Sequence, residues 1–196
     1  MLAAAILSAG ESRRMGTPKA LLSYRGTTFL EHLLAITQHP RIGITRVVLG
    51  AGAGAIRDKL HLETGAIVVN NEWVKGQLSS IQAAVRSLGR GETEGLILCP
   101  VDHPLVSTNL VSRLIEGFDS SGKAVVLPTY KGRRGHPVIF RATLYDELLD
   151  AAPELGARQV VWAHADDVLA VPTEEEGVVL NLNDPETLRQ ALDDKA

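Results

Sequence analysis

The segment from Ala3 to Lys19 constrains the fold more than any other part of the chain. It begins with a short run of small and apolar residues, Ala3–Leu7, which is typical of a strand buried at the centre of a sheet. The run breaks into a loop that contains Gly10, Gly16, two arginines and a lysine. Glycine lets backbone N–H groups approach a ligand closely, and cations offset the charge of phosphate oxygens. The segment therefore predicts a strand followed by either a polyphosphate-binding loop or an ordinary solvated turn.

The composition is that of an ordinary globular protein. The 196 residues are 45% hydrophobic and 22% charged, which predicts one domain over residues 1–196 with a sizeable core. A net charge of −3 with no basic run argues against nucleic-acid binding. The lone cysteine, Cys99, excludes an internal disulfide framework and predicts a small buried side chain at a strand end. No stretch is apolar enough to span a membrane and the N-terminus lacks the basic start of a signal peptide, so we expect a cytoplasmic protein.

Strand-like and helix-like segments alternate along the whole chain, which predicts an α/β sheet with helices on its faces. A helix is expected after Thr28, where Thr28 and Glu31 have the spacing of a capping box, and another over residues 184–193. A basic turn at 130–135 predicts that the strand after it pairs as a hairpin-like, antiparallel member. After the first strand, the expected strands are residues 46–50, 66–70, 95–99, 124–127, 137–140, 168–172 and 178–182.

Four connections follow predicted strands and are expected to line one cleft, because open α/β sheets bind ligands beyond the carboxyl ends of their strands. They are the loop after the first strand, Asn71–Ser80, Pro100–Pro104 and Asn181–Asp184.

Two aspartates in these connections have two possible roles each. Asp102 either caps the helix that follows or binds the divalent cation that a nucleoside triphosphate requires. Asp184 is either the N-cap of the last helix or an additional carboxylate near a metal. We favour the cap for Asp184 because Pro185 suits the first helical position.

The first loop resembles the signature L-A-A-G-x-S-x-R-M-G-x-P-K of the nucleotidyltransferases that activate molybdopterin, with Ser8 in place of an alanine. The residues that match it are Leu7, Ala9, Gly10, Ser12, Arg14, Met15, Gly16, Pro18 and Lys19. Further segments resemble motifs of the same family in the same order: N-x-x-W-x-x-G-x-x-x-S at Asn70, Trp73, Gly76 and Ser80, D-x-P at Asp102, G-R-R-G-H-P-V-x-F at 132–140 and [ND]-x-[ND]-T-P-E-[DE]-L at 181–188. Gly156–Arg158 resembles only the end of the family's G-x-x-G-A-R.

These motifs together resemble the molybdenum cofactor cytidylyltransferase family of the MobA-like NTP transferase superfamily. The resemblance implies a Rossmann-like nucleotidyltransferase domain with a mixed, mostly parallel sheet of about seven strands and helices on both faces. It implies transfer of CMP from CTP to the terminal phosphate of molybdopterin, with release of pyrophosphate. The implied partners are these small molecules and a transient complex with a molybdoenzyme or its maturation chaperone, with no nucleic acid and no membrane.

The resemblance also assigns roles to residues. The catalytic set is Arg14, Lys19 and Asp102, and the metal ligands for Mg²⁺ or Mn²⁺ are Asp102 and Asn183. The nucleotide-binding set is Leu7, Ala9, Gly10, Ser12, Arg14, Gly16, Lys19, Asn70, Gly76, Ser80 and Asp102. The acceptor-binding set is Arg133, Arg134, His136 and Arg158. His103 is expected to be a neighbour of the site and not a ligand.

Base choice and activity class have alternatives. Gly76–Ile81 and Ser8–Gly10 look like the cytidylyl branch, since guanylyltransferases tend to carry G-P-L-A-G-I and L-A-G-G there. A sugar-1-phosphate nucleotidyltransferase and a non-catalytic nucleotide sensor or cofactor-binding maturation protein are the alternatives. An NAD-dependent oxidoreductase is the weakest, because the G-x-G-x-x-G spacing and its following acidic residue are missing.

Overall fold

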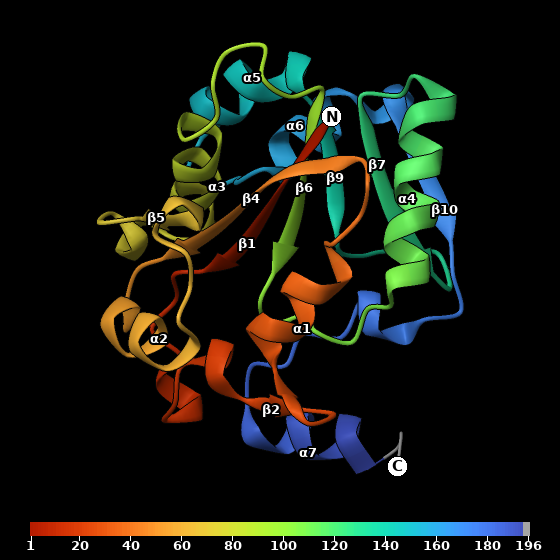
Figure 1. Cartoon of the computed structure of the whole chain (residues 1–196). Helices are drawn as coiled ribbons and strands as arrows, with labels where there is room; N and C mark the ends of the chain where they lie inside the picture. The colour runs from red at the N-terminus through yellow and green to blue at the C-terminus, as the bar shows by residue number, and fades with distance from the viewer. Residues whose placement is uncertain (194–196) are drawn as a thin grey trace.

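The computed structural model describes residues 1–193, so the predicted domain end at residue 196 lies outside the described residues. Within them, a central sheet of eight strands has the order β10-β7-β9-β6-β1-β4-β5, with β8 paired to β7 (Figure 1). The strands are β1 Leu2–Ser8, β4 Ile42–Leu49, β5 Ile67–Val69, β6 Gly95–Pro100, β7 Val125–Tyr130, β8 Arg133–Arg134, β9 Val138–Arg141 and β10 Val168–Pro172. A small separate sheet pairs β2 Ser23–Tyr24 with β3 Thr27–Thr28.

The sheet is mixed and mostly parallel, as predicted. β1 is parallel to both β4 and β6, and β7 is parallel to β10. β9 is antiparallel to β6 and β7, which confirms the hairpin-like insertion predicted after the basic turn. The short β8 lies within the basic turn and was not among the strands predicted from the sequence.

Helices cover both faces of the sheet, and successive side chains of β1 point alternately into the two apolar clusters that lie between the sheet and these helices. Leu2, Ala4 and Ile6 belong to one cluster, with apolar residues of α1, α2, α4 and α7, whereas Ala3, Ala5 and Leu7 belong to the other, with residues of α3, α5 and α6 (Figure 1). The helices are α1 Phe29–Ile36, α2 Ala53–Leu60, α3 Gln77–Arg86, α4 Thr108–Ser121, α5 Tyr145–Asp150, α6 Arg158–Ala163 and α7 Pro185–Asp193. Among residues 1–193, none of these helices has the length and apolar character needed to cross a membrane.

The predicted capping box at the start of α1 is confirmed. The Thr28 hydroxyl accepts a hydrogen bond from the Glu31 amide at 3.2 Å, and the Glu31 carboxylate accepts one from the Thr28 amide at 2.7 Å. Both bonds satisfy amides that have no partner inside the helix.

The strand predicted over 178–182 is wrong. Glu176–Val178 is a 3₁₀ helix, and residues 179–184 form no strand, although Val178 and Leu182 are fully buried. Val178 and Leu182 are buried without being part of a strand, because their backbone groups form hydrogen bonds with two different loops. The Val178 carbonyl accepts from the His136 amide at 2.9 Å, and the Leu182 amide donates to the Asp102 carbonyl at 2.8 Å.

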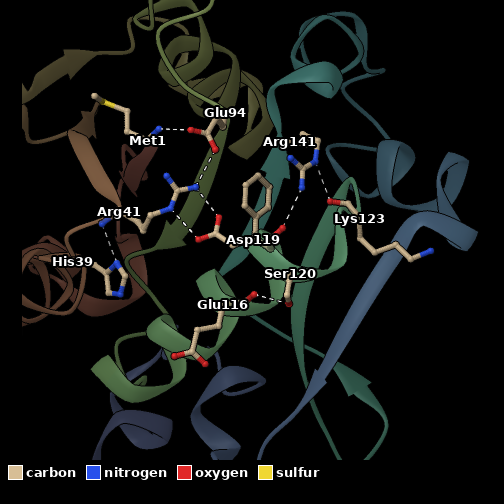
Figure 2. A network of polar contacts seen from close by, with 10 residues as sticks. Met1, His39, Arg41, Glu94, Glu116, Asp119, Ser120, Lys123 and Arg141 are labelled. Atoms are coloured by element: carbon tan, nitrogen blue, oxygen red, sulfur yellow. Dashed lines mark hydrogen bonds and ion pairs between the residues drawn. The ribbon is translucent and has the colours of Figure 1, made fainter.

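A network of ion pairs lies where the parallel strands β1, β4 and β6 begin, and Figure 2 shows this network. Arg41, just before β4, pairs with Asp119 of α4 at 2.6 Å and with Glu94, just before β6, at 2.9 Å. Glu94 also accepts from the Met1 ammonium at 2.5 Å, and these partners lower the pKa of Glu94 to about 2. This edge is thus occupied by structural contacts, and the four predicted connections lie at the opposite edge.

Candidate active site

The loop after β1 is held in place by its own side chains. Ser12 adopts a left-handed backbone conformation, with φ of 54°, and Gly16 another, with φ of 66°. The Ser12 hydroxyl accepts a hydrogen bond from the Lys19 amide at 3.0 Å. Since this bond joins the two ends of the basic turn, it fixes the backbone from which the Lys19 side chain extends.

Lys19 reaches two residues that lie far from it in the sequence. Its Nζ is 3.5 Å from Asp102 Oδ2, and it also donates to Asn183 Oδ1. The side chains of Lys19 and Asp102 are only 15% and 20% exposed. The segment after residue 176 brings Asn183 to this point, because its Leu182 amide bonds the Asp102 carbonyl. The sequence-predicted cation and both sequence-predicted metal ligands therefore lie together.

The donor set fits a divalent cation. A carboxylate oxygen and an amide oxygen are ligands that Mg²⁺ and Mn²⁺ accept, with water and phosphate oxygens completing the shell. Both oxygens already contact a positive charge, the Lys19 ammonium. Within residues 1–193, no group of three or more His, Cys, Asp and Glu side chains forms a metal site by itself. The pair thus suits an ion that arrives with phosphate ligands.

A cavity of about 380 Å³ lies beside this cluster. The predicted nucleotide-binding residues in its wall are Leu7, Ala9, Gly10, Ser12, Lys19, Gly76, Ser80 and Asp102. The wall also contains residues outside the predicted set: Ser8, Pro18, Ile56, Trp73, Gln77, Pro100, Val101, His103, His136 and Asn181. Pro18, Trp73, His136 and Asn181 belong to motifs described in the sequence analysis, so the sequence did contain a signal for them. Gly50 makes room for Trp73, since a Cβ there would lie 2.7 Å from the Trp73 Cβ.

Three predicted nucleotide-binding residues are not in this wall. Arg14 and Gly16 lie in the exposed part of the first loop. Asn70 is 4% exposed, and its amide nitrogen donates to the hydroxyls of Ser79 at 2.9 Å and Ser80 at 3.0 Å. Its carbonyl oxygen accepts from the Glu72 amide. The structure therefore shows Asn70 tying the start of α3 to the end of β5, where it positions Ser80.

A second cavity, of about 430 Å³, adjoins the first and shares Leu7, Gln77, Pro100 and His136 with it. Arg134, His136 and Arg158 of the predicted acceptor set line it, whereas Arg133 lines neither cavity. Arg133 and Arg134 alternate on the two sides of β8, after a turn in which Lys131 and Gly132 both have positive φ. Much of the remaining wall is apolar and includes Val138, Phe140 and Trp162.

His136 lines both cavities and lies beside His103, with ring centroids 4.8 Å apart. His103 is 9% exposed and lines the first cavity only, as a neighbour of Asp102. Burial lowers the pKa of His103, and burial together with the adjacent His103 lowers the pKa of His136 to about 4. Both rings are therefore neutral near pH 7.

Asp184 is a helix cap, as favoured from the sequence. Its carboxylate accepts from the Thr187 amide at 2.9 Å and from the Thr187 hydroxyl, and these bonds lower the pKa of Asp184. Cys99 is 2% exposed at the end of β6, and burial raises the pKa of its thiol to about 12. It is the small buried side chain predicted from the sequence.

Comparison with known proteins places this chain in a family. A family model described as the MobA-like NTP transferase domain matches residues 4–168. The chain belongs to this family. The superfamily resemblance seen in the motifs is thereby confirmed, and with it membership of a nucleotidyltransferase enzyme family.

Two curated relatives of this MobA-like NTP transferase carry different activity names. Nicotine blue oxidoreductase of Paenarthrobacter nicotinovorans is 33% identical over 168 residues, covering 80% of this chain and 81% of that protein. Molybdenum cofactor guanylyltransferase of Shewanella sp. strain ANA-3 is 26% identical over 188 residues, covering 93% and 91%. The preference for cytidine remains a prediction.

Solved structures confirm the Rossmann-like nucleotidyltransferase fold. Rv0371c from Mycobacterium tuberculosis H37Rv superposes with a TM-score of 0.82 at 28% identity, covering 98% of this chain and 97% of that one. The same mycobacterial protein in complex with manganese superposes with a TM-score of 0.78 at 25% identity and the same coverage. A related structure thus holds a divalent metal.

Proposed function

We propose that this MobA-like NTP transferase transfers CMP from CTP to the terminal phosphate of molybdopterin. The observation that carries the proposal is the meeting of Lys19, Asp102 and Asn183 beside a cavity that adjoins a second cavity with Arg134 and Arg158 in its wall. Nucleotidyl transfer joins two anionic substrates, so it requires two adjoining sites with separate cations. The whole chain, residues 1–196, acts as one nucleotidyltransferase domain, and it hands its product to a molybdoenzyme or its maturation chaperone.

The residues of the first cavity bind the nucleotide. Lys19 and the backbone of residues 10–16 hold the β- and γ-phosphates, and Arg14 adds its charge from the exposed part of the same loop, outside the cavity wall. Gly76 and Ser80 face the ribose and base. An oxygen of the acceptor phosphate forms a bond to the α-phosphorus while the bond to the bridging oxygen breaks, and pyrophosphate leaves. The acceptor phosphate is already ionised at neutral pH, so the reaction depends on positioning and charge stabilisation and requires no general base.

Asp102 and Asn183 would hold the divalent ion, magnesium or manganese, as their oxygen donors fit. When bound, that ion supplies charge neutralisation at the α-phosphate oxygens. The manganese complex of the mycobacterial relative supports the use of a divalent ion.

The second cavity receives the acceptor. Arg134 and Arg158 attract its phosphate, since guanidinium groups stay charged and bind phosphate in a forked geometry. His136 belongs to both walls and, being neutral, donates or accepts a hydrogen bond there. Arg133 acts only at the outer rim, because it lies in neither wall.

A panel of nucleoside triphosphates tests the base and the acceptor. Pyrophosphate release is measured for CTP, GTP, ATP and UTP with molybdopterin, and with sugar 1-phosphates as the alternative acceptors. We expect release with CTP and molybdopterin. Consumption of GTP alone refutes the cytidylyl assignment, use of a sugar phosphate favours that alternative, and CTP binding without turnover favours a non-catalytic maturation protein.

The metal assignment has its own test. Asp102→Ala should abolish metal-dependent pyrophosphate release, whereas Asp150→Ala, an exposed carboxylate at the end of α5, should leave it unchanged. Near-normal turnover in Asp102→Ala would remove the metal assignment.

The relationship to nicotine blue oxidoreductase favours a second candidate, an oxidoreductase that uses the same two cavities. The missing dinucleotide glycine pattern opposes it. Oxidation of NADH or NADPH in the presence of an aromatic dye, without pyrophosphate release from any triphosphate, would establish this alternative.

A further inference from the structure

The Lys19 side chain contacts both proposed metal ligands at once. Its Nζ is 3.5 Å from Asp102 Oδ2 and donates to Asn183 Oδ1. The Lys19 backbone is held in place, because its amide donates a hydrogen bond to the Ser12 hydroxyl and residues 19–21 form a 3₁₀ helix. Only the flexible four-carbon stem is free to redirect the ammonium.

The Lys19 ammonium occupies the position between these two oxygens that a metal ion would take. A divalent ion that arrives alone must displace it and then lie beside a like charge in a partly buried site, where water screens the repulsion only weakly. A triphosphate changes this balance, because its oxygens offer Lys19 new anionic partners in the same cavity. Lys19 can then leave Asp102 and Asn183 without losing its ionic contacts.

We propose that Lys19 occupies the cation position of the nucleotide-free chain and couples metal binding to triphosphate binding. A bare divalent ion binds weakly, and the triphosphate draws Lys19 away so that Asp102 and Asn183 become available together. Lys19 is in this respect a positioning residue for the metal ligands, in addition to its contact with phosphate. The inference rests on the proposed nucleotidyl transfer, in which Asp102 and Asn183 hold the metal.

Binding of Mn²⁺ alone to the purified full chain tests whether Lys19 weakens the binding of a bare divalent ion. Free Mn²⁺ is measured by electron paramagnetic resonance for the wild type and for Lys19→Met, a flexible apolar replacement of similar length. We expect Lys19→Met to bind Mn²⁺ more tightly by about 5- to 150-fold, the usual range of coupling between two sites. Arg14→Met is the matched control, because Arg14 is an exposed cation of the same loop whose charge reaches Asp184. An unchanged affinity in Lys19→Met, or an equal gain in Arg14→Met, overturns the proposal.

Binding of inorganic tripolyphosphate in the presence of EDTA tests whether the triphosphate draws Lys19 away from Asp102 and Asn183. Asp102→Asn should strengthen this metal-free binding in the wild-type background, because it releases Lys19. The same change should have a clearly smaller effect in the Lys19→Met background. Equal effects in both backgrounds would show simple loss of negative charge and refute the coupling.

One further variant separates this inference from the proposed function. Asp102→Asn combined with Lys19→Met should lose the tight Mn²⁺ site. If that double variant still binds Mn²⁺ as tightly as Lys19→Met does, the metal assignment itself is wrong. If the double variant loses Mn²⁺ binding, but Lys19→Met binds Mn²⁺ no more tightly than the wild type does, only the coupling is wrong.

Discussion

Gly177→Ala is expected to damage the site from outside it. A Cβ at Gly177 would lie 1.9 Å from the Leu105 carbonyl oxygen and 2.6 Å from the Leu105 Cβ. Real Cβ atoms do not approach backbone so closely, so the segment after residue 176 must shift. That segment carries Val178 and Leu182, whose backbone groups bond His136 and Asp102, and it ends at Asn183.

The magnitude follows from the two consequences of this shift. Overpacking a core position costs about 1–3 kcal/mol, and weakening one or two backbone hydrogen bonds adds about 1 kcal/mol. We therefore expect the free energy of unfolding to fall by roughly 2–4 kcal/mol. Pyrophosphate release should fall further, by up to about 100-fold in kcat/KM, because a displacement of about 1 Å at a reacting centre has such an effect.

Urea unfolding and pyrophosphate release measure the two effects separately. Gly54→Ala is the matched control: Gly54 lies in α2, and a Cβ there would meet nothing within 4 Å. Its free energy of unfolding should rise by at most about 0.5–1 kcal/mol, since alanine favours a helix more than glycine does and Gly54 lies in the first turn of α2. If Gly177→Ala unfolds within about 0.5 kcal/mol of the wild type and keeps full turnover, the packing argument is refuted.

Three other changes probe separate contacts. Asn70→Ala should lower the free energy of unfolding by about 1–3 kcal/mol, measured in urea, because it leaves two serine hydroxyls and an amide without their buried partner. Ser12→Ala should raise the KM for the triphosphate by about 2- to 10-fold with little change in unfolding, because the Lys19 amide loses its partner; an unchanged KM contradicts this. Glu94→Gln should destabilise the chain above pH 4.5, because the folded pKa of about 2 lies below the ordinary 4.5. The difference from wild type should shrink as pH falls from 4.5 through 2, and a pH-independent difference in urea unfolding would count against the ionic network with Arg41.

The sheet was predictable because its signals are local. The all-buried run Leu2–Ser8 has neighbours on both sides and both faces, so an uninterrupted series of small and apolar residues is required there. The basic turn likewise marked the change to antiparallel pairing, since Lys131 and Gly132 adopt the positive φ values of a tight hairpin between β7 and β8, and β9 then pairs antiparallel with β7.

Contacts between distant segments could not be predicted in the same way. Val178 and Leu182 carry the apolar pattern of a strand, but their backbone partners lie in two loops that are far apart in the sequence. Asn70 fits a nucleotide-facing motif by spacing, yet its buried amide bonds two serines of α3. In both cases the residue type was informative, and only the fold decided which partner it meets.

The charges of the cleft connect the two cavities to the two anions of the proposed reaction. Lys19 lies in the wall of the first cavity, which we propose for the nucleotide, and Arg134 and Arg158 lie in the wall of the second, which we propose for the acceptor. His136, which lines both cavities, and the adjacent His103 are kept neutral by burial, with the pKa of His136 near 4. A charged pair at that position would attract both phosphates to one point, whereas a neutral pair leaves each anion with its own cation. The boundary between the cavities is therefore where we expect the acceptor oxygen to meet the α-phosphorus.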